Sequence, residues 1–184
     1  MHILTDFEVI PDAFSKYAPE QNKIDGHAVV SFPFKVEGIA PGFNYLHIAF
    51  TDPDSIPVAG FAWIHWCAAN IRISDASRNA LIPEDFSRNM KELSPESCRG
   101  KNSLVSRFVG QASSPASSLY IGPTPPDKTH FYLLRVWATE EKLDLKDGFY
   151  LSDLLHSLLA SGSAPDASST LKVPQACALL AGRA

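Results

Sequence analysis

The sequence predicts a mainly β protein, with antiparallel strands at its centre and a few short helices at the edges and near the end of the chain. Stretches rich in aromatic and β-branched residues cluster at 28–73 and recur at 130–138, without the regular alternation of strand and helix that marks a βαβ protein. Several of these stretches are apolar on both faces, which is typical of the centre of a packed sheet. Helical patterns are confined to 83–93 and to the segment after Ser152. The chain length predicts a single domain over residues 1–184.

Four strands are expected, separated by turn residues. Pro41–Gly42 predicts the turn between the first two strands, and the Pro-rich stretch DPDSIP (52–57) predicts a loop between the second and the third. In the second strand both alternating sets of side chains are largely apolar, so we expect burial on both faces. The expected strands are, in chain order, AVVSFPFKVEG (28–38), FNYLHIAFTD (43–52), FAWIHWCAANI (61–71) and HFYLLRVWA (130–138).

One helix is expected within the polar, Ser- and Pro-rich region 74–119. It begins at Pro83, which suits a first helical position, and ends at Leu93. Phe86 and Met90 lie on the same stripe as Leu93, so the three side chains are expected to pack together against the sheet.

A second helix is expected after Ser152, which can cap it, and it runs to about Ala160 with Gly162 as its stop. The composition of SGSAPDASST (161–170) predicts a flexible loop, and a last short helix is expected in PQACALLAG (174–182). The apolar face of the helix after Ser152 is formed by Leu154, Leu155, Leu158 and Leu159.

Composition excludes several classes of function. A net charge of −4 and a pI near 5.8 argue against a nucleic-acid binder and against a polybasic membrane anchor. Asp6 and Glu8 interrupt the apolar core that a signal peptide would need, and no apolar run approaches the ~18 residues of a membrane span. We therefore expect a soluble, cytoplasmic protein without an integral membrane segment. Cys67, Cys98 and Cys177 are widely spaced, which predicts reduced thiols and neither a metal site nor a cofactor.

The first candidate site is the pair Asp52 and Asp54, directly after an apolar strand. Asp and Pro both favour turns, so a purely structural turn is one interpretation. The other is a carboxylate held at a strand end, where it accepts hydrogen bonds from a ligand or orients a histidine.

The second candidate is His65, a single titratable ring among aromatic and small apolar residues. Strict strand periodicity places it on one face with Phe61, Trp63 and Cys67. It is either a core histidine bonded to a backbone carbonyl or a hydrogen-bonding group in the wall of a pocket, with Trp63 or Trp66 excluding water.

The third candidate is the stretch YIGPTPPDKTHFY (120–132). Its prolines make a stiff loop, and the remaining N–H groups, at Tyr120, Ile121, Gly122 and Thr124, could point into one concavity that favours an anion. His130 and Tyr132 are two residues apart and so project from one face of the following strand. A hairpin loop followed by a core strand is the alternative interpretation.

Taken together, these motifs resemble one family. D-P-D, then H-W about ten residues later, then Y-x-G-P-x-P-P and H-x-Y form the pattern of the phosphatidylethanolamine-binding proteins, and in particular of their bacterial Raf-kinase-inhibitor-like branch. IPDAFSKYAPEQNKIDG (10–26) is similar to the family's opening segment, and LLRVWATEEKLDLKDG (133–148) to a strand that leads into its L-x-L-x-x-G turn. The resemblance covers about residues 7–160.

The resemblance implies a β-sandwich-like fold with a small anion pocket at one end, which binds phosphate or phosphorylethanolamine-type headgroups. Two departures stand out. Phe131 follows His130 where the family commonly has Arg, and residues 161–184 lack the family's histidine-bearing helix, which predicts a more open pocket. The residues that the resemblance assigns to the ligand are Asp52, Asp54, His65, Tyr120, Gly122, Pro123, His130 and Tyr132, and which of the two aspartates faces the pocket is left open.

Four functional hypotheses follow. In the first, His65 and His130 donate hydrogen bonds to a small anion, Tyr132 adds another, and the Asp carboxylate fixes a histidine tautomer or accepts a proton from the ligand. The second is a regulatory interaction protein for a kinase or protease, with 74–119 as the partner surface, and a homodimer is also expected. The third is a hydrolase, in which His65, His130 and an Asp hold a metal or serve Ser55 as a nucleophile. The fourth is a retained fold with an unused pocket.

Overall fold

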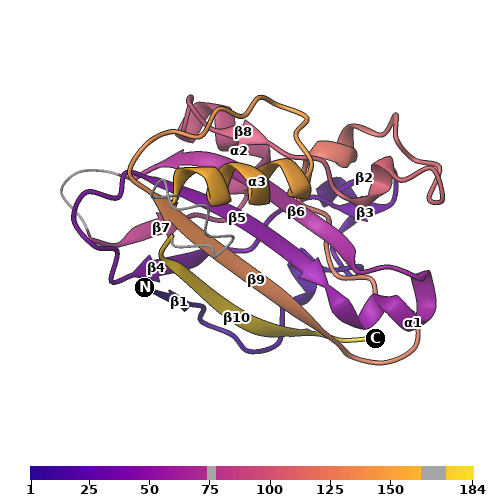
Figure 1. The fold of residues 1–184 in the computed structure, drawn as a ribbon. Helices are drawn as coiled ribbons and strands as arrows, with labels where there is room; N and C mark the ends of the chain where they lie inside the picture. Colours follow the sequence, from indigo (N-terminus) through magenta and orange to yellow (C-terminus); the bar gives the residue numbers. More distant parts are fainter. Residues whose placement is uncertain (74–77, 163–172) are drawn as a thin grey trace.

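The computed structural model describes residues 1–73, 78–162 and 173–184. Its centre is a five-stranded antiparallel sheet whose strands lie in the order β10-β9-β5-β6-β8 (Figure 1). The prediction of a mainly β protein built from antiparallel sheets is therefore confirmed. The strands of this central sheet are β5 (Tyr45–Asp52), β6 (Trp63–Arg72), β8 (Cys98–Arg99), β9 (His130–Thr139) and β10 (Gln175–Gly182).

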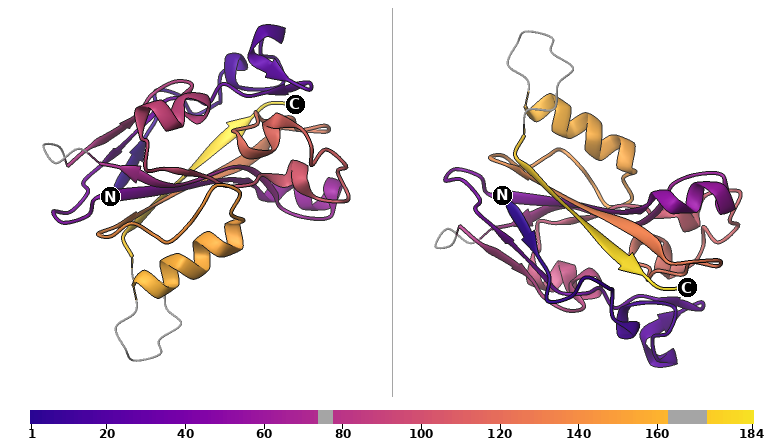
Figure 2. Two further views of the ribbon diagram at one scale, coloured as in Figure 1. Left: turned by 90° about the horizontal axis from the view of Figure 1, so that it is seen from above. Right: turned by 90° about the horizontal axis from the view of Figure 1, so that it is seen from below.

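The central sheet is covered on both faces (Figure 2). A small three-stranded sheet, in the order β1-β4-β7, lies against one face, and the helix α3 packs on the other. Two layers of sheet with the apolar core between them give the sandwich-like arrangement that the resemblance implies. The remaining strands are β1 (His2–Leu4), β2 (Lys23–Ile24), β3 (His27–Ala28), β4 (Phe34–Glu37) and β7 (Ala80–Ile82).

Helices occur at the edges and connections of the sheets. Every helix within residues 1–73, 78–162 and 173–184 is too short or too polar to span a bilayer. The α-helices are α1 (Ile56–Ala59), α2 (Phe86–Leu93) and α3 (Leu151–Ser161). The 3-10 helices are Asp12–Phe14, Glu20–Asn22, Pro53–Ser55, Ser103–Val105 and Pro115–Ser118.

Strand β5 is buried on both faces, as its two apolar sets predict. Leu46 and Phe50 enter the larger core, between the two sheets. Ala49 points to the other side, where Trp137 and Leu154 form a second cluster beneath α3. Full burial of a large apolar side chain contributes about 1.5–3 kcal/mol, so packing on two faces holds β5 firmly in place. The strand therefore fixes the position of its last residue, Asp52.

The helix predicted from Pro83 begins later, at Phe86. Asp85 has a left-handed backbone conformation, with φ of 59°, which cannot continue into a right-handed helix. Phe86 and Met90 are buried as expected, but Leu93 is 53% exposed and does not pack with them against the sheet.

Helix α3 begins at Leu151, so Ser152 lies inside its first turn and is not its cap. The carboxylate of Asp153 accepts a hydrogen bond of 2.8 Å from the backbone N–H of Tyr150 and stabilises the start of the helix instead. The helix ends before Gly162, as predicted. Of the four leucines expected on its apolar face, Leu154 and Leu158 are fully buried, Leu155 is exposed and Leu159 is partly buried.

The helix predicted at 174–182 is wrong, because this segment forms the edge strand β10. It pairs with β9 along its whole length, from Gln175 opposite Trp137 to Gly182 opposite His130. An Ala- and Leu-rich sequence favours a helix locally, but pairing with β9 satisfies its backbone and buries Leu180 in the core. The loop predicted at 161–170 falls almost entirely outside the described residues.

Candidate functional site

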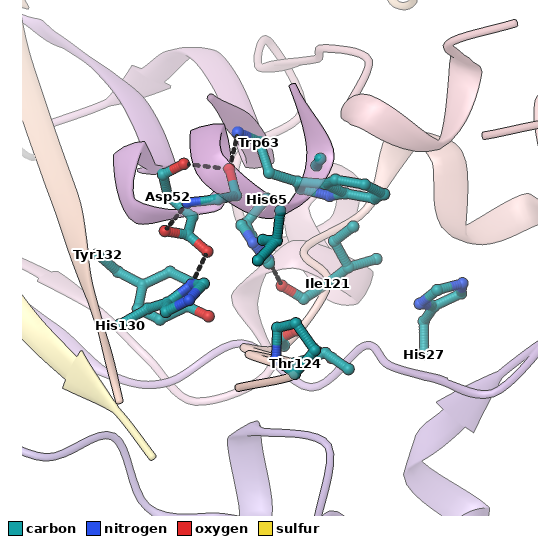
Figure 3. A pocket seen from close by; sticks show the side chains of 13 residues that line it. His27, Asp52, Trp63, His65, Ile121, Thr124, His130 and Tyr132 are labelled. Carbon is teal, nitrogen blue, oxygen red and sulfur yellow. Dashed lines mark hydrogen bonds and ion pairs between the residues drawn. The ribbon is translucent and has the colours of Figure 1, made fainter. Parts of the chain in front are cut away.

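A pocket opens at the end of the central sheet where β5 ends and where β6 and β9 begin (Figure 3). Its volume is about 250 Å³. Apolar side chains from α1, among them Val58, form part of its wall, together with Trp63. The polar residues that line it are His27, Asp52, Ser55, His65, Thr124, His130 and Tyr132.

Asp52 and His130 form a buried ion pair at one side of the pocket. His130 Nδ1 lies 2.8 Å from Asp52 Oδ2, and both side chains are almost fully buried. The other nitrogen, Nε2, lies 3.0 Å from Oδ1 of Asp127, whose side chain is 48% exposed. Burial lowers the pKa of His130, but the hydrogen bonds and charges of Asp52 and Asp127 outweigh it and raise the pKa above its usual value. When His130 is protonated, its two N–H groups donate to the two carboxylates, so neither is directed to a ligand, contrary to the prediction.

His65 combines both interpretations that the sequence left open. Its Nδ1 lies 2.8 Å from the carbonyl oxygen of Ile121, as in a core histidine, yet the ring also lines the pocket. A carbonyl only accepts hydrogen bonds, so the proton of the neutral ring is on Nδ1 and Nε2 is an acceptor. Burial lowers the pKa of His65 to about 4, which keeps the ring neutral at ordinary pH. His65 was predicted to donate a hydrogen bond to the ligand. With its ring neutral, Nε2 accepts a hydrogen bond instead.

A β-bulge directs His65 toward the pocket. The register of β5 and β6 shifts between Phe50, opposite Trp66, and Thr51, opposite Ile64, so His65 is the extra residue. Its ring contacts that of Phe50, which belongs to the core between the sheets, whereas Cys67 belongs to the cluster under α3. The expectation that His65 and Cys67 share a face is therefore wrong, because strict alternation does not hold across a bulge.

Two buried donors in the pocket lining are in no well-aligned hydrogen bond within the described protein, namely Tyr132 Oη and Trp63 Nε1. The Asp52 carboxylate and the backbone N–H of Thr124 nevertheless lie close to the Tyr132 hydroxyl. Tyr132 packs edge-on against His65, with ring centroids 5.1 Å apart. Burial, followed by the charge of Asp52, raises the pKa of Tyr132, so its hydroxyl stays protonated. An unmet buried donor is unfavourable by about 1–3 kcal/mol, and a bound acceptor would remove that penalty.

Three of the four N–H groups that were predicted to form an anion site in the 120–126 loop are bonded elsewhere. The N–H of Tyr120 donates to Ser87 Oγ, that of Ile121 to the carbonyl of His65, and that of Gly122 to the carbonyl of Ala28. These bonds are 2.7 to 2.9 Å long. The loop is thus tied to three neighbouring segments and shapes the pocket wall without offering those N–H groups to an anion.

Three of the residues that the resemblance assigns to the ligand do not line the pocket. Tyr120 is fully buried and its hydroxyl donates to the carbonyl of Phe14, so it belongs to the core. Asp54 accepts a hydrogen bond of 2.9 Å from the N–H of Phe131 and so stabilises the start of β9. Pro123 belongs to the loop and lies close to Gly182. The residues that do line it are Asp52, His65, Gly122, His130 and Tyr132.

Sequence reasoning missed two polar residues at this site, His27 and Asp127, and considered only the backbone N–H of Thr124, a residue that also lines the pocket. His27 reaches the pocket from β3, where Gln111 Oε1 lies 2.6 Å from its Nε2, and nothing local in the sequence predicts that contact. Thr124 lies at the rim of the pocket. Asp127 could have been found, because a carboxylate three residues before a histidine at the start of a strand can reach its ring.

Ser55 and the histidines do not form a nucleophile and its base. The hydroxyl of Ser55 lies 2.6 and 2.8 Å from the carbonyl oxygens of Asp52 and Phe61, and it accepts the N–H of Trp63. It is a structural link between the two ends of the 53–62 connection. Among the residues that the structure describes, no cluster of three or more His, Cys, Asp or Glu side chains could hold a metal.

These features define a class of protein: an antiparallel sandwich with a small, partly apolar pocket at one end of its central sheet, built around a buried Asp–His pair. The chain matches the sequence profile of the phosphatidylethanolamine-binding proteins over residues 4–165. The protein therefore belongs to the phosphatidylethanolamine-binding protein family. Strand β10 lies beyond the matched region.

Individual relatives agree with this assignment. The chain is 41% identical to the uncharacterized protein YxkA of Bacillus subtilis over 80% of this chain and 83% of that protein. It is 28% identical to a UPF0098 protein of Methanothermobacter thermautotrophicus over 76% of this chain and 80% of the relative. Among solved structures it resembles E. coli YBCL, described as a new member of the mammalian PEBP family (TM-score 0.68, 17% identity, 100% and 98% of the chains covered). A putative PEBP homolog from Chlamydia trachomatis is also similar (TM-score 0.63, 19% identity, 98% and 95% covered).

Proposed function

We propose that the protein is a non-enzymatic binding protein whose pocket takes a small ligand with a negative group and a hydrogen-bond donor, such as a phosphorylethanolamine-type headgroup. The observation that carries the proposal is the pair of donors in the pocket lining, Tyr132 Oη and Trp63 Nε1, that are in no well-aligned hydrogen bond within the described protein. A phosphate or phosphodiester oxygen would accept from them once the two side chains rotate enough to bring these buried atoms to the pocket surface. The acceptor Nε2 of His65 would take the ligand's own donor, for example an ammonium N–H, whereas both oxygens of Asp52 already accept hydrogen bonds from Ser55 and His130.

The charge balance of the pocket favours such a ligand over a bare anion. The Asp52 carboxylate and the His130 imidazolium cancel each other, and His65 is neutral. A multiply charged anion would find no net positive charge in the lining, whereas a zwitterionic headgroup brings its own compensation. Apolar groups beside it, such as Val58, would contact the carbon chain that joins the two charges.

Replacing Tyr132 with phenylalanine is expected to weaken binding of phosphorylethanolamine at least about tenfold, because one hydrogen bond to a charged acceptor contributes about 1.5–3 kcal/mol. The stability of the free protein should not fall, since the hydroxyl is in no well-aligned hydrogen bond within the described protein and its burial is unfavourable. Calorimetric titration gives the affinity, and urea denaturation gives the free energy of unfolding.

Tyr120→Phe is the matched control. The Tyr120 hydroxyl donates to the carbonyl of Phe14 at 2.7 Å and lies outside the pocket lining. This variant should therefore lose about 1 kcal/mol of stability and keep its affinity. If the two variants bind equally well, Tyr132 does not contact the ligand and the proposed binding mode is wrong.

Occupancy of the pocket could be communicated to a protein partner, such as a kinase or a protease, through the loop 106–113. Gln111 in this loop holds His27 of the pocket wall, and Phe108 in the same loop is the most exposed large apolar side chain described. We propose that a partner contacts this part of the 74–119 region. A pull-down in the presence and absence of phosphorylethanolamine tests it, and a partner whose capture is unaffected by ligand would contradict the link.

The proposal also covers the cellular location of the protein and its oligomeric state. We propose that the protein acts in the cytoplasm, in line with its three free cysteines, and forms a homodimer. Light scattering coupled to gel filtration measures the molecular mass directly, and the mass of a single chain at micromolar concentration would contradict the dimer. A hydrolase remains the less favoured alternative, because the Ser55 hydroxyl is bonded to backbone carbonyls and not to a histidine.

A further inference from the structure

A chain of hydrogen bonds links solvent to the pocket through Asp127, His130 and Asp52. Asp127 does not line the pocket; it lies in the loop before β9 with its side chain half exposed. Its Oδ1 is 3.0 Å from His130 Nε2, and Asp52 Oδ2 is 2.8 Å from His130 Nδ1. Only Asp52, at the inner end of the chain, and His130 itself contribute to the pocket surface.

This geometry requires a proton on each nitrogen of His130. Ionised carboxylates accept hydrogen bonds and cannot donate them, so a neutral imidazole could satisfy only one of its two neighbours. Asp52 alone would be satisfied by the neutral ring with its proton on Nδ1. It is Asp127 that gives the second proton, on Nε2, a partner.

Other groups around His130 do not replace Asp127. His65 is neutral and so does not favour a second proton on His130. If His65 were charged, it would disfavour that proton. Asp54 is engaged with the backbone of Phe131. The titratable groups that face His130 from the elements packed around it are Asp52 on β5, Asp54 in the following turn, His65 on β6, Asp127 in the loop before β9 and Tyr132 on β9.

We propose that Asp127 is a positioning residue that holds the second proton on His130 from outside the pocket and thereby sets the highest pH at which the pocket accepts an anionic group. The inference rests on the proposed function. When His130 loses that proton, the charge of Asp52 is left uncompensated beside the ligand's negative group, and the two repel each other. Binding is therefore present below the pKa of His130 and lost above it, and Asp127 moves that limit upward.

The effect on binding that we expect from removing Asp127 is opposite in sign to that of simple charge repulsion. A carboxylate close to an anion pocket should weaken binding, so its removal should strengthen binding at every pH. If Asp127 acts through His130, its removal leaves binding unchanged in acid and weakens it only near and above neutral pH. A merely structural role would weaken binding equally at all pH values.

The test compares the wild type with Asp127→Asn by calorimetric titration with glycerophosphoethanolamine between about pH 5 and 8.5, the range in which histidine titrates. This probe has a phosphodiester whose charge is constant over that range, so any pH dependence comes from the protein. The midpoint at which affinity is lost should move down by about one pH unit in the variant, as expected for the loss of one opposite charge from a histidine. Glu92→Gln, which makes the same change of net charge on α2, outside the pocket, is the control and should leave the midpoint unchanged.

Ring NMR signals of His130, followed in the same pH series without ligand, should show a lower pKa in Asp127→Asn than in the wild type. An unchanged binding midpoint, or an equal loss of affinity at all pH values, would overturn the inference and leave the proposed function standing. Absence of binding by the wild type at every pH would overturn the proposed function, and this inference with it.

Discussion

Replacement of Asp52 by alanine is expected to lower the free energy of unfolding by about 3 kcal/mol at neutral pH, the lower end of the range for breaking one side of a buried ion pair. Asp52 accepts two buried hydrogen bonds, from His130 Nδ1 and from the backbone N–H of Ser55. Alanine leaves both donors without a partner. The expected loss of stability lies at the lower end of that range because His130, without Asp52, can release a proton and so avoid an uncompensated buried charge. Urea denaturation of the purified variant measures it.

Two companion variants separate charge from hydrogen bonding. Asp52→Asn keeps an acceptor for one of the two donors but cannot compensate the imidazolium, so its loss of stability should be intermediate. Asp127→Ala removes the half-exposed partner of the same ring and should lower stability by clearly less than Asp52→Ala, because solvent screens an exposed ion pair. Equal losses for Asp52→Ala and Asp127→Ala would show that burial does not distinguish the two carboxylates.

Three strands of the central sheet could be predicted because their own sequences carry the pattern. β5, β6 and β9 are apolar on both faces, and packing from two sides enforces what the pattern indicates. β10 could not, since QACALLAG has no alternation and favours a helix. Only the free edge of β9, a property of the folded sheet, decides its conformation.

The candidate site divides in the same way. Asp52, His65, His130 and Tyr132 are placed by strands that the sequence predicts, and all four line one pocket. The roles of their atoms depend on partners that lie far away in the sequence. His65 became an acceptor because its Nδ1 meets the carbonyl of Ile121, and His130 is engaged on both nitrogens.

Replacement of Gly122 by alanine is expected to lower the free energy of unfolding by about 2–3 kcal/mol, because a side chain there overpacks the core. A Cβ at this position would lie 2.5 Å from the carbonyl oxygen of Phe14 and 3.0 Å from Cα of Ser15 and from Cβ of Ala28. The closest of these atoms are backbone, so the loop itself must move. Its displacement would also stretch the hydrogen bond from Gly122 to Ala28, which is 2.8 Å long.

The same displacement reaches the pocket through the preceding residue. The carbonyl of Ile121 fixes the ring of His65, so Gly122→Ala should weaken binding of phosphorylethanolamine as well as stability. Gly110→Asn is the control, since Gly110 has open space around it and asparagine tolerates its left-handed conformation. Urea denaturation and calorimetric titration of both variants check the two effects together. A Gly122→Ala protein as stable as Gly110→Asn would mean that the loop can shift freely, and that the pocket wall is not fixed by its contact with Phe14.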